Sequence, residues 1–470
     1  MTQETNSRAM GEHTAVDGDR ELSADEVEAL VREYDSESNF RNLVGPTAML
    51  VTLASVTLSL FHVYTAGFGL LNEVMHRTIH LSFVMGLIFL VFPRKRAVAT
   101  RKIWIESLIF AGFYLYILYD IAMSLPPSTL KTVFIVVVLA LVVLTLPLNF
   151  KDAQPGKLAV RDWVFAAFGA GFSAYLTIFF KHIFIDNVGS PPDPVYMMGV
   201  VAIIMTLEAT RRTMGPMLAW IGIGCLLYAL VGPYLPGILA HRGYSITRIV
   251  NHLFIGTEGI YGVAVGVVAT YVFHFVLFGI LAQMSGLGQL FIDLATIIAG
   301  RASGGSAKVS VVSSGFFGMI SGSPIANTVT TGAFTIPLMK KSGFSGRFAG
   351  AVEASASCGG QITPPIMGAS AFVMTEMLGI PYNELILIAI VPACFHYIAI
   401  LLMVHLEAKK LGLEGLSKDK IPQFGAVLKK SWHLFIPLGV MVAMLLMQYT
   451  PFLAAFWGII LTIAFSYVPL

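Results

Sequence analysis

The sequence predicts an all-α polytopic membrane protein, and three observations support that class. Hydrophobic residues make up 56% of the 470 residues and charged residues only 12%, whereas a soluble domain carries about 25% charged residues. Apolar stretches long enough to cross a bilayer, roughly 20 residues each, recur along the chain. One polar segment, 304–365, interrupts this series with many Gly, Ser, Thr, Asn and Pro residues. Irregular backbone survives in hydrocarbon only where protein or a watery cavity surrounds it, so we expect the functional site in this segment.

We expect about 12 membrane helices, because a rise of 1.5 Å per residue lets each apolar stretch cover much of the roughly 30 Å hydrocarbon layer. The stretches are 44–71, 75–93, 103–123, 132–150, 162–183, 195–210, 216–235, 259–284, 366–379, 383–406, 432–449 and 452–470. The stretch 288–300 is too short to span and fits a position along the membrane plane.

Residues 1–43 are polar and acid-rich, and they lack the basic and apolar regions of a signal peptide. Ser23 and Glu26 form a capping box ahead of apolar residues at helical spacing. We therefore expect a short amphipathic helix here, packed on the cytoplasmic surface.

The distribution of basic residues indicates the orientation in the membrane. Alternate loops are rich in Lys and Arg, whereas loop 184–194 has none. The basic loops contain Arg94, Lys95, Arg96, Arg101, Lys102, Lys151, Lys157, Arg161, Arg211, Arg212, Lys340, Lys341, Arg347, Lys409, Lys410, Lys418, Lys420, Lys429 and Lys430. The positive-inside rule places these loops and the N-terminus in the cytoplasm. The net charge of the whole chain is only +3, which gives no reason to expect a nucleic-acid partner.

Residues 305–341 are expected to form a re-entrant helical hairpin. Basic residues flank both ends, so the segment enters and leaves on the cytoplasmic side. Its tip falls at 321–324, Ser-Gly-Ser-Pro. A second break, 359–365, interrupts the following span 346–379, because Gly-Gly permits unusual backbone angles and two Pro residues lack N–H donors.

These two breaks carry the predicted ion and substrate site. Freed carbonyls at half-helix ends are ligands for a hard cation such as Na⁺, and half-helix N-termini favour an anion. The candidate residues are Ser321, Gly322, Ser323, Asn327 and Thr328 at the hairpin, and Gly359, Gly360, Gln361, Thr363 and Pro364 at the second break. Neither tip contains Asp or Glu, and a neutral shell suits a monovalent ion bound together with an anion.

Small residues also permit close helix packing, which is the alternative interpretation of the same composition. Packing does not require Pro-Pro in mid-span, so a site is favoured at the two tips. For the flanking residues 309–315 and 330–332, packing is the favoured interpretation.

Isolated charges have simpler interpretations. Glu208 and Arg211, three residues apart, are expected to pair on one helix face near its cytoplasmic end. Glu353 lies about two helical turns before the second break, and two roles stay open: support of the ion site or pairing with Lys or Arg. Asp293 is expected on a solvated face.

Metal chelation by His or Cys is not expected. His274 and His396 stand alone in apolar spans without partners at ligand spacing, so packed histidines are the favoured interpretation. Cys225, Cys358 and Cys394 form no CxxC or other metal spacing.

Two long motifs resemble a known family. SGSPIANTVTTGAFTIPLMKKSGF at 321–344 and GGQITPPIMGASAF at 359–372 are similar to the membrane component of tripartite ATP-independent periplasmic (TRAP) transporters. LEATRR at 207–212, HRGYS at 241–245 and GGSAKVSVVSS at 304–314 resemble the branch with fused small and large membrane subunits, which pairs with the TAXI type of periplasmic binding protein. The resemblance covers about residues 44 to 450.

The resemblance implies a secondary transporter in the cytoplasmic (inner) membrane of a bacterium or archaeon, not an enzyme. In an elevator mechanism, a mobile domain would carry Na⁺ and an organic anion, usually a carboxylate, that a soluble periplasmic protein delivers. The family's Na⁺ ligands map onto Ser321, Ser323, Asn327, Gly359 and Thr363, with Gly360 in the unwound helix. Apart from Na⁺ as coupling ion, no cofactor is implied.

The resemblance also implies a division of the chain. A polar N-terminus, 1–43, precedes small-subunit-like scaffold spans at 44–235, a periplasmic loop at 236–258 and the first half of a large-subunit-like transport region at 259–470. Such large subunits contain two inverted halves, and only one hairpin and one broken span occur here. We therefore expect a truncated chain with half of the substrate site.

The periplasmic loop contains His241, Arg242, Tyr244 and Arg248, where positive charge runs against the general trend. One interpretation is docking of an acidic patch on the binding protein, and the other is an ordinary solvated loop.

The sequence leaves two alternatives to a binding-protein-dependent transporter. A citrate- or dicarboxylate-type carrier that works without a binding protein would share the hairpin but would not need spans 44–235. An intramembrane serine hydrolase would use Ser321 or Ser313 with His274 or His396, but the matching serine motif is missing.

Overall fold

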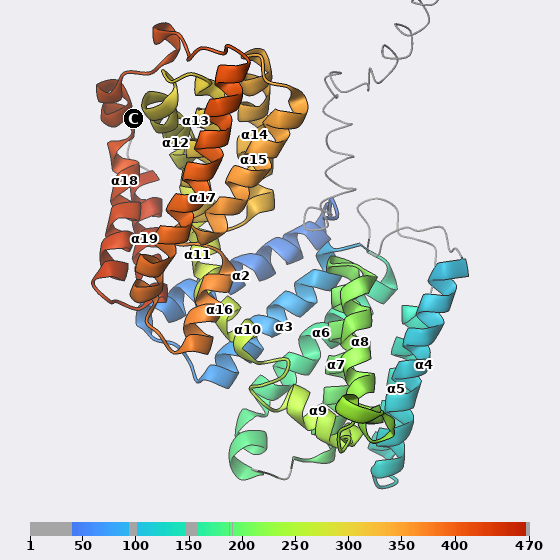
Figure 1. Cartoon of the computed structure of the whole chain (residues 1–470). Coiled ribbons are helices and arrows are strands. Elements are labelled where there is room, and N and C mark those ends of the chain that lie inside the picture. The colour runs from blue at the N-terminus through green and yellow to red at the C-terminus, as the bar shows by residue number, and fades with distance from the viewer. Residues whose placement is uncertain (1–39, 94–100, 147–157, 188, 190, 467–470) are drawn as a thin grey trace, which may run out of the picture. The chain divides into compact units, whose positions relative to one another are not determined.

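A computed structural model describes residues 40–93, 101–146, 158–187, 189 and 191–466 (Figure 1). The helix expected within residues 1–43 lies almost wholly outside this range. The described residues form α-helices with short 3₁₀ and π turns and contain no strand, which confirms the all-α class. Eight described helices are long and apolar enough to cross a membrane, and several shorter apolar helices accompany them.

The described residues of Asp35–His274 form one compact unit, the N-terminal unit, and those of Phe275–Leu470 form another, the C-terminal unit. The N-terminal unit contains α2 (Pro46–Phe68), α3 (Glu73–Val91), α4 (Arg101–Ser124), α5 (Thr129–Thr145), α6 (Val160–Ile178), η1 (His182–Asp186), α7 (Asp193–Thr213), α8 (Pro216–Val231), η2 (Gly232–Tyr234), η3 (Gly237–Leu239), α9 (Ile246–Phe254), α10 (Val263–Val267) and η4 (Val268–Val272). The segment 236–258, expected as a loop, thus includes η3 and α9.

Helices α3 and α6 form the closest pair in the N-terminal unit. Gly169 on α6 faces the Phe89 ring on α3 so closely that a Cβ would lie 2.8 Å from it. The Ser173 hydroxyl donates to the Thr78 carbonyl at 2.8 Å. Small residues therefore bring the two backbones together, as is common between membrane helices.

A buried ion-pair network joins α6 and α7, and we call it the arginine network. Arg212 donates to Asp162 at 2.7 Å and to Glu208 at 3.1 Å, and all three side chains are 1% exposed. Arg211 contacts Glu208 at 2.6 Å, which confirms the predicted pair. Arg41 contacts Asp162 from outside the two helices at 2.7 Å.

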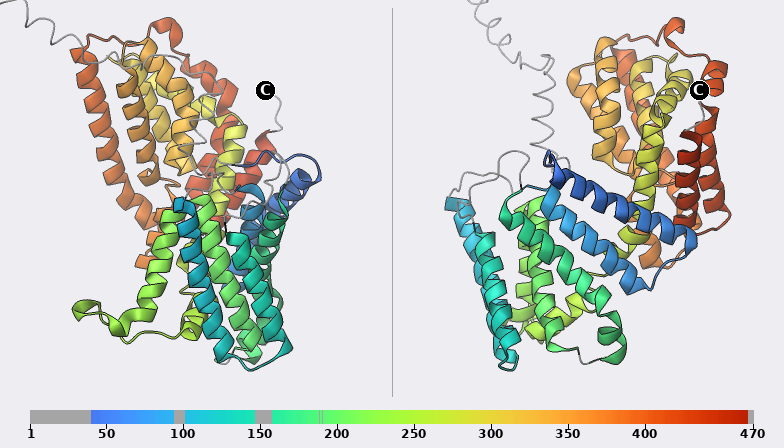
Figure 2. Two further views of the ribbon diagram at one scale, coloured as in Figure 1. Left: turned by 90° about the vertical axis from the view of Figure 1, so that its right-hand side faces the viewer. Right: turned by 180° about the vertical axis from the view of Figure 1, so that it is seen from behind.

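The C-terminal unit contains most of α11 (Phe273–Met284), then α12 (Leu287–Ala299), α13 (Gly305–Ser321), α14 (Pro324–Lys341), α15 (Gly346–Gly359), η5 (Gly360–Ile362), α16 (Ala369–Leu378), α17 (Tyr382–Lys410), η6 (Lys418–Lys420), α18 (Phe424–Leu446) and α19 (Pro451–Ser466). Helices α13, α14, α15 and α17 pack side by side (Figure 1). Figure 2 draws this bundle in yellow to orange from two further sides.

Local sequence explains both helix breaks. Gly322 follows α13 with φ of 63°, a left-handed conformation that glycine adopts readily. The Ser323 hydroxyl then accepts from the Ala326 N–H at 3.3 Å, and Pro324 begins α14. Helix α15 ends at Gly359, and regular helix resumes only at Ala369. The Pro364–Pro365 peptide bond within this gap is cis.

Candidate functional site

The hairpin tip and the second break meet backbone to backbone. A Cβ on Gly360 would lie 2.3 Å from the Gly318 Cα, and a Cβ on Gly322 would lie 2.5 Å from the Met367 carbonyl oxygen. The Ile366 N–H donates to the Met319 carbonyl at 3.3 Å. Glycine is therefore required at these positions for the two unwound segments to touch.

Asn327 is a buried polar side chain on the hairpin side of this contact. It is 1% exposed, and its amide nitrogen donates to the Ser314 carbonyl at 2.8 Å. Its amide oxygen has a single long contact, 3.3 Å from the Thr331 hydroxyl. That oxygen therefore keeps most of its capacity to bind another donor or a cation.

The other predicted hairpin residues differ in how they are bonded. The Ser321 hydroxyl is buried and has no hydrogen-bond partner among the described residues. The Ser323 oxygen is already used to cap α14. Thr328 is partly exposed, next to the buried Asn327 along the helix.

At the second break, several predicted groups bond to one another. The Thr363 hydroxyl donates to the Gly359 carbonyl at 2.7 Å. The Gln361 carbonyl accepts from the Gly368 N–H at 2.8 Å, while the Gln361 residue is exposed. Local hydrogen bonds therefore fix the backbone conformation of the break. Its direct contact with the hairpin is made by Gly360.

A buried carboxylate lies below these breaks, and we call its surroundings the hydroxyl cage. Glu353 on α15 is 0% exposed. Its Oε1 accepts from Ser314 at 2.6 Å, from Ser357 at 3.3 Å and from Thr331. Its Oε2 accepts from Ser310 at 2.6 Å and from Thr335 at 2.5 Å. Five hydroxyl groups from α13, α14 and α15 therefore surround one carboxylate.

The hydroxyl cage bears on one of the two roles open for Glu353, the pairing with Lys or Arg; support of the ion site stays a prediction. No described Lys or Arg pairs with it, so the alternative of an ion pair is not what the described structure contains. Hydrogen bonds from hydroxyl groups stabilise a carboxylate, but they do not cancel its charge.

Three residues of 309–315 and 330–332 do more than permit the close helix packing favoured there. Ser310, Ser314 and Thr331 bind Glu353 instead of merely allowing close helix approach. The signal was present in the sequence as hydroxyl or carboxyl groups four residues apart on each of three helices, at 310/314, 331/335 and 353/357. Residues four apart share a helix face.

The hydroxyl cage is continuous with the hairpin tip. The Thr331 hydroxyl lies 2.8 Å from the Asn327 carbonyl, in addition to its contact with Glu353. Asn327 in turn bonds to Ser314, which is also a cage residue. One polar network therefore runs from the buried carboxylate to the residue predicted as a cation ligand.

The two histidines expected to stand alone, His274 and His396, have different surroundings. The His396 Nε2–H donates to the Ser355 carbonyl at 3.0 Å, as expected for a packed histidine. The interpretation of His274 as a lone histidine is wrong, because its ring lies 5.4 Å from that of His62 and its Nε2 lies 2.9 Å from the His62 carbonyl. Asp293 is half-buried and accepts from the exposed Gln289 at 2.8 Å.

The predicted docking residues are arranged as two small groups. His241 is held by the Tyr228 carbonyl at 2.9 Å from its Nε2. Arg242 and Arg248 both lie over the Tyr244 ring, with guanidinium carbons 5.4 Å and 5.3 Å from its centroid. The two arginines and the tyrosine are exposed, so they form a positively charged surface.

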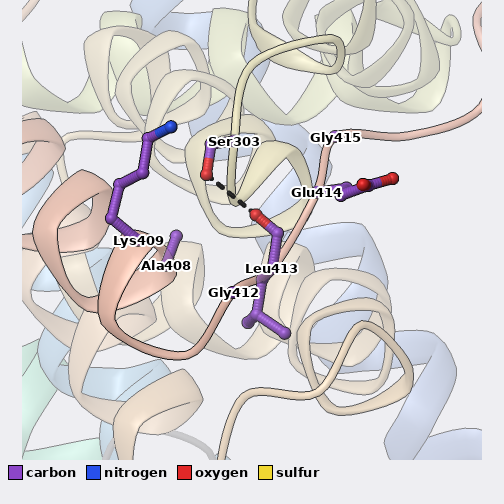
Figure 3. Close-up of a pocket in the computed structure, with 7 residues that line it drawn as sticks. All are labelled: Ser303, Ala408, Lys409, Gly412, Leu413, Glu414 and Gly415. Atoms are coloured by element: carbon purple, nitrogen blue, oxygen red, sulfur yellow. Dashed lines mark hydrogen bonds between the residues drawn. The ribbon is translucent and has the colours of Figure 1, made fainter.

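A surface cavity of ≈ 330 Å³ lies at the C-terminal end of α17 (Figure 3). It is lined by Ser303, Ala408, Lys409, Gly412, Leu413, Glu414 and Gly415. The Ser303 hydroxyl donates to the Leu413 carbonyl at 2.8 Å, which ties the loop to the helix end. In Figure 3 the Lys409 and Glu414 side chains extend in different directions, so they do not converge on a ligand.

The fold and the site together define a class of membrane protein. The described chain combines apolar helices of spanning length with a helical hairpin and a broken helix, which meet at a polar network around a buried carboxylate. Broken helices that join polar groups inside a membrane protein are typical of secondary transporters.

The comparison with protein families agrees with that class. The model of the "Tripartite ATP-independent periplasmic transporter, DctM component" matches residues 201–468, more than half of the chain. The chain therefore belongs to this family of TRAP transporter permease components, which work with a periplasmic solute-binding protein. A search of curated proteins found no match to the sequence.

Proposed function

We propose that this permease component couples Na⁺ entry to the uptake of an organic anion, a carboxylate, that a TAXI-type periplasmic protein delivers. The observation that carries the proposal is the polar network that joins Asn327 to the buried Glu353. This network connects the Asn327 amide oxygen, a possible cation ligand, to the Glu353 carboxylate, which no described Lys or Arg pairs with.

The cation is proposed to bind at the hairpin tip. The Ser321 hydroxyl and the Asn327 amide oxygen are the tip groups with free acceptor capacity, and main-chain carbonyls of the two breaks complete the shell. Ser323 contributes less, because its oxygen caps α14. Thr363 and Gly359 bond to each other, so a cation there competes with that hydrogen bond.

Glu353 favours cation binding through its charge. It lies six residues before Gly359 on the same helix, which corresponds to about 9 Å along the axis. At an effective dielectric constant of about 20, an ionised carboxylate at that distance stabilises a monovalent cation by on the order of 2 kcal/mol. A neutral tip with a negative charge behind it suits Na⁺ better than a divalent ion, which needs several carboxylates.

The anion is proposed to bind between the two breaks and the N-terminus of α14, where the partial positive charge of a helix end favours it. Binding of the cation beside it offsets the anion's charge, which couples the two ligands. The C-terminal unit packs around its own core and is the proposed mobile domain of an elevator mechanism.

Reconstitution in liposomes tests this function. Purified protein is combined with the periplasmic protein encoded beside it, and the ligand that copurifies with that protein is identified by mass spectrometry. Uptake of that ligand is then measured with a Na⁺ gradient, with a proton gradient and with neither. Uptake driven by Na⁺ alone is expected, and uptake driven only by a proton gradient would overturn the choice of ion.

The second candidate function is a carrier that needs no binding protein. The same liposomes separate it, because a binding-protein-independent carrier would take up free substrate at the same rate without the periplasmic protein. The exposed group of Arg242, Tyr244 and Arg248 favours a docked partner and is the reason for ranking this candidate second.

A further inference from the structure

Four buried histidines in the N-terminal unit come together, and we call them the histidine cluster. His62 lies on α2, His76 and His80 lie on α3, and His274 lies on α11 next to the π-helical turn η4. Each is 3% exposed or less. Ionisable residues inside membrane helices are costly and usually functional, so four together require an explanation.

The other three rings surround His62. Its Nε2 lies 2.8 Å from the His80 Nδ1, a direct hydrogen bond between two imidazoles. Its ring centroid lies 5.2 Å from that of His76, 5.0 Å from that of His80 and 5.4 Å from that of His274. Phe61 stacks on His76 and Phe273 packs against His62, so aromatic rings line the cluster.

Main-chain carbonyls hold two of the rings in a defined state. The His76 Nε2 lies 3.2 Å from the Ala269 carbonyl, which belongs to the π-helical turn η4. The His274 Nε2 lies 2.9 Å from the His62 carbonyl. A carbonyl only accepts, so both Nε2 atoms carry the hydrogen, and in the neutral rings both Nδ1 atoms are bare acceptors.

Three of these nitrogens have no partner. The Nδ1 atoms of His62, His76 and His274 are buried and make no hydrogen bond within the described residues. Buried polar atoms are almost always bonded, because an unpaired one costs the full loss of its hydration. Three unpaired nitrogens in one cluster therefore indicate a ligand that the cluster accepts.

A metal ion does not fit the arrangement, because no described group of three or more His, Cys, Asp or Glu side chains has the geometry to hold one. A water molecule or a proton can satisfy a bare imidazole nitrogen, and the two differ in whether the cluster gains a charge. Histidine is the side chain whose charge changes most readily near neutral pH.

Most charged groups on the packed helices are paired with one another. Arg77 on α3 lies beside the cluster, where it pairs with Glu73 and donates to the Tyr261 carbonyl at 2.7 Å. The other titratable groups on the packed helices α2, α6, α7 and η4 are Tyr64, Arg161, Asp162, Tyr175, Asp193, Tyr196, Glu208, Arg211, Arg212 and Tyr271. Of these, Asp162, Glu208, Arg211 and Arg212 belong to the arginine network.

We propose that the histidine cluster is a proton-binding site that takes up a single proton. The proton comes from water and adds to one bare Nδ1, no bond to carbon or oxygen breaks, and the cluster gains one positive charge. The hydrogen bond between His62 and His80 lets two rings share it. A second proton is excluded, because two positive rings about 5 Å apart repel strongly outside water. The proposal is independent of the Na⁺ site, which lies in the other unit.

Nitrogen-15 NMR of the full chain in lipid nanodiscs tests the proposal. Histidine is labelled at both ring nitrogens, and spectra are recorded between pH 8 and pH 5. Cluster signals are assigned by their loss in His62→Gln and His80→Gln, and the exposed His252 is the matched control through His252→Gln. We expect one titration step, equivalent to one proton, that several cluster signals share.

The outcomes are distinct. A shared step that disappears in His62→Gln but survives in His252→Gln supports the proposal. Cluster signals that stay neutral down to pH 5 would overturn it. Four separate steps, or a shift of the same signals on adding Zn²⁺ at constant pH, would also overturn it. The wild-type spectra answer the question alone if a variant fails to fold.

Discussion

The two units bury carboxylates in opposite ways. In the arginine network, Asp162 and Glu208 are paired with Arg212 at 2.7 Å and 3.1 Å, and Arg41 and Arg211 add further contacts. In the hydroxyl cage, Glu353 is just as buried but contacts hydroxyl groups only. Arginines pair with the carboxylates of the network, whereas the described partners of Glu353 are all hydroxyl groups. Under the proposed function, this difference separates a carboxylate that holds the fold together from one that acts on a cation.

Removing Arg212 is expected to have the largest effect on stability. Arg212→Met leaves two buried carboxylates short of a partner and removes a guanidinium that lies 5.1 Å and 4.9 Å from the centres of the Phe89 and Phe165 rings. Breaking a buried pair costs about 3–5 kcal/mol. Denaturation in detergent micelles is expected to show a loss of this size.

The matched control is Lys410→Met, which breaks the exposed pair with Glu407. Exposed pairs contribute only about 0–1 kcal/mol. If Arg212→Met and Lys410→Met lower the stability equally, the arginine network does not stabilise the fold more than an exposed ion pair does.

Neutralising Glu353 is expected to weaken Na⁺ binding without unfolding the protein. Glu353→Gln keeps the side-chain volume and removes the charge, and its amide oxygen still accepts from cage hydroxyls. The amide nitrogen only donates, so the hydroxyl groups beside it must turn to accept. The loss of on the order of 2 kcal/mol corresponds to about a 20- to 30-fold rise in the Na⁺ concentration for half-maximal uptake. Uptake into liposomes measures this concentration, and thermal unfolding checks that the fold persists.

Two controls sharpen the Glu353 result. The exposed Glu384→Gln removes a negative charge from the same unit and is expected to leave the Na⁺ dependence unchanged. Glu208→Gln is expected to lower stability instead. An unchanged Na⁺ dependence in Glu353→Gln would show that the cage is structural after all.

A smaller effect is expected at the hairpin tip. Asn327→Ala removes one proposed oxygen ligand together with the hydrogen bond to the Ser314 carbonyl. One ligand is expected to contribute about tenfold, or ~1.4 kcal/mol, to Na⁺ affinity. Thr330→Ala is the control, because Thr330 lies on the exposed side of α14 and bonds only to the Ala326 carbonyl. Equal Na⁺ half-saturation in both variants would remove Asn327 from the site.

Local sequence was sufficient to predict the helix breaks but not the polar clusters. Gly322 and Pro324 act on their own backbone, so the ends of α13 and α14 fall at the expected residues. Glu353 depends on hydroxyl groups from three helices, and a single spacing four residues apart is common in membrane helices without any such contact. His62 and His274 are separated by more than 200 residues, so only the tertiary fold brings them together. Their grouping could not be read from spacing along the chain.

The smallest effect is expected at the exposed positive surface, where no described carboxylate pairs with the arginines. Arg242 and Arg248 stack on Tyr244 and present their charge outward, in contrast to the internally paired arginines of the arginine network. The double variant Arg242→Gln/Arg248→Gln is expected to slow association of the periplasmic protein by a few-fold, because rim charges act mainly on the association rate.

Surface plasmon resonance on nanodiscs measures that association rate, and the effect of the double variant is expected to shrink as salt rises. The exposed Arg347→Gln, on the predicted cytoplasmic side, is expected to have no effect. Equal slowing in both would mean that overall charge, and not this surface, attracts the partner.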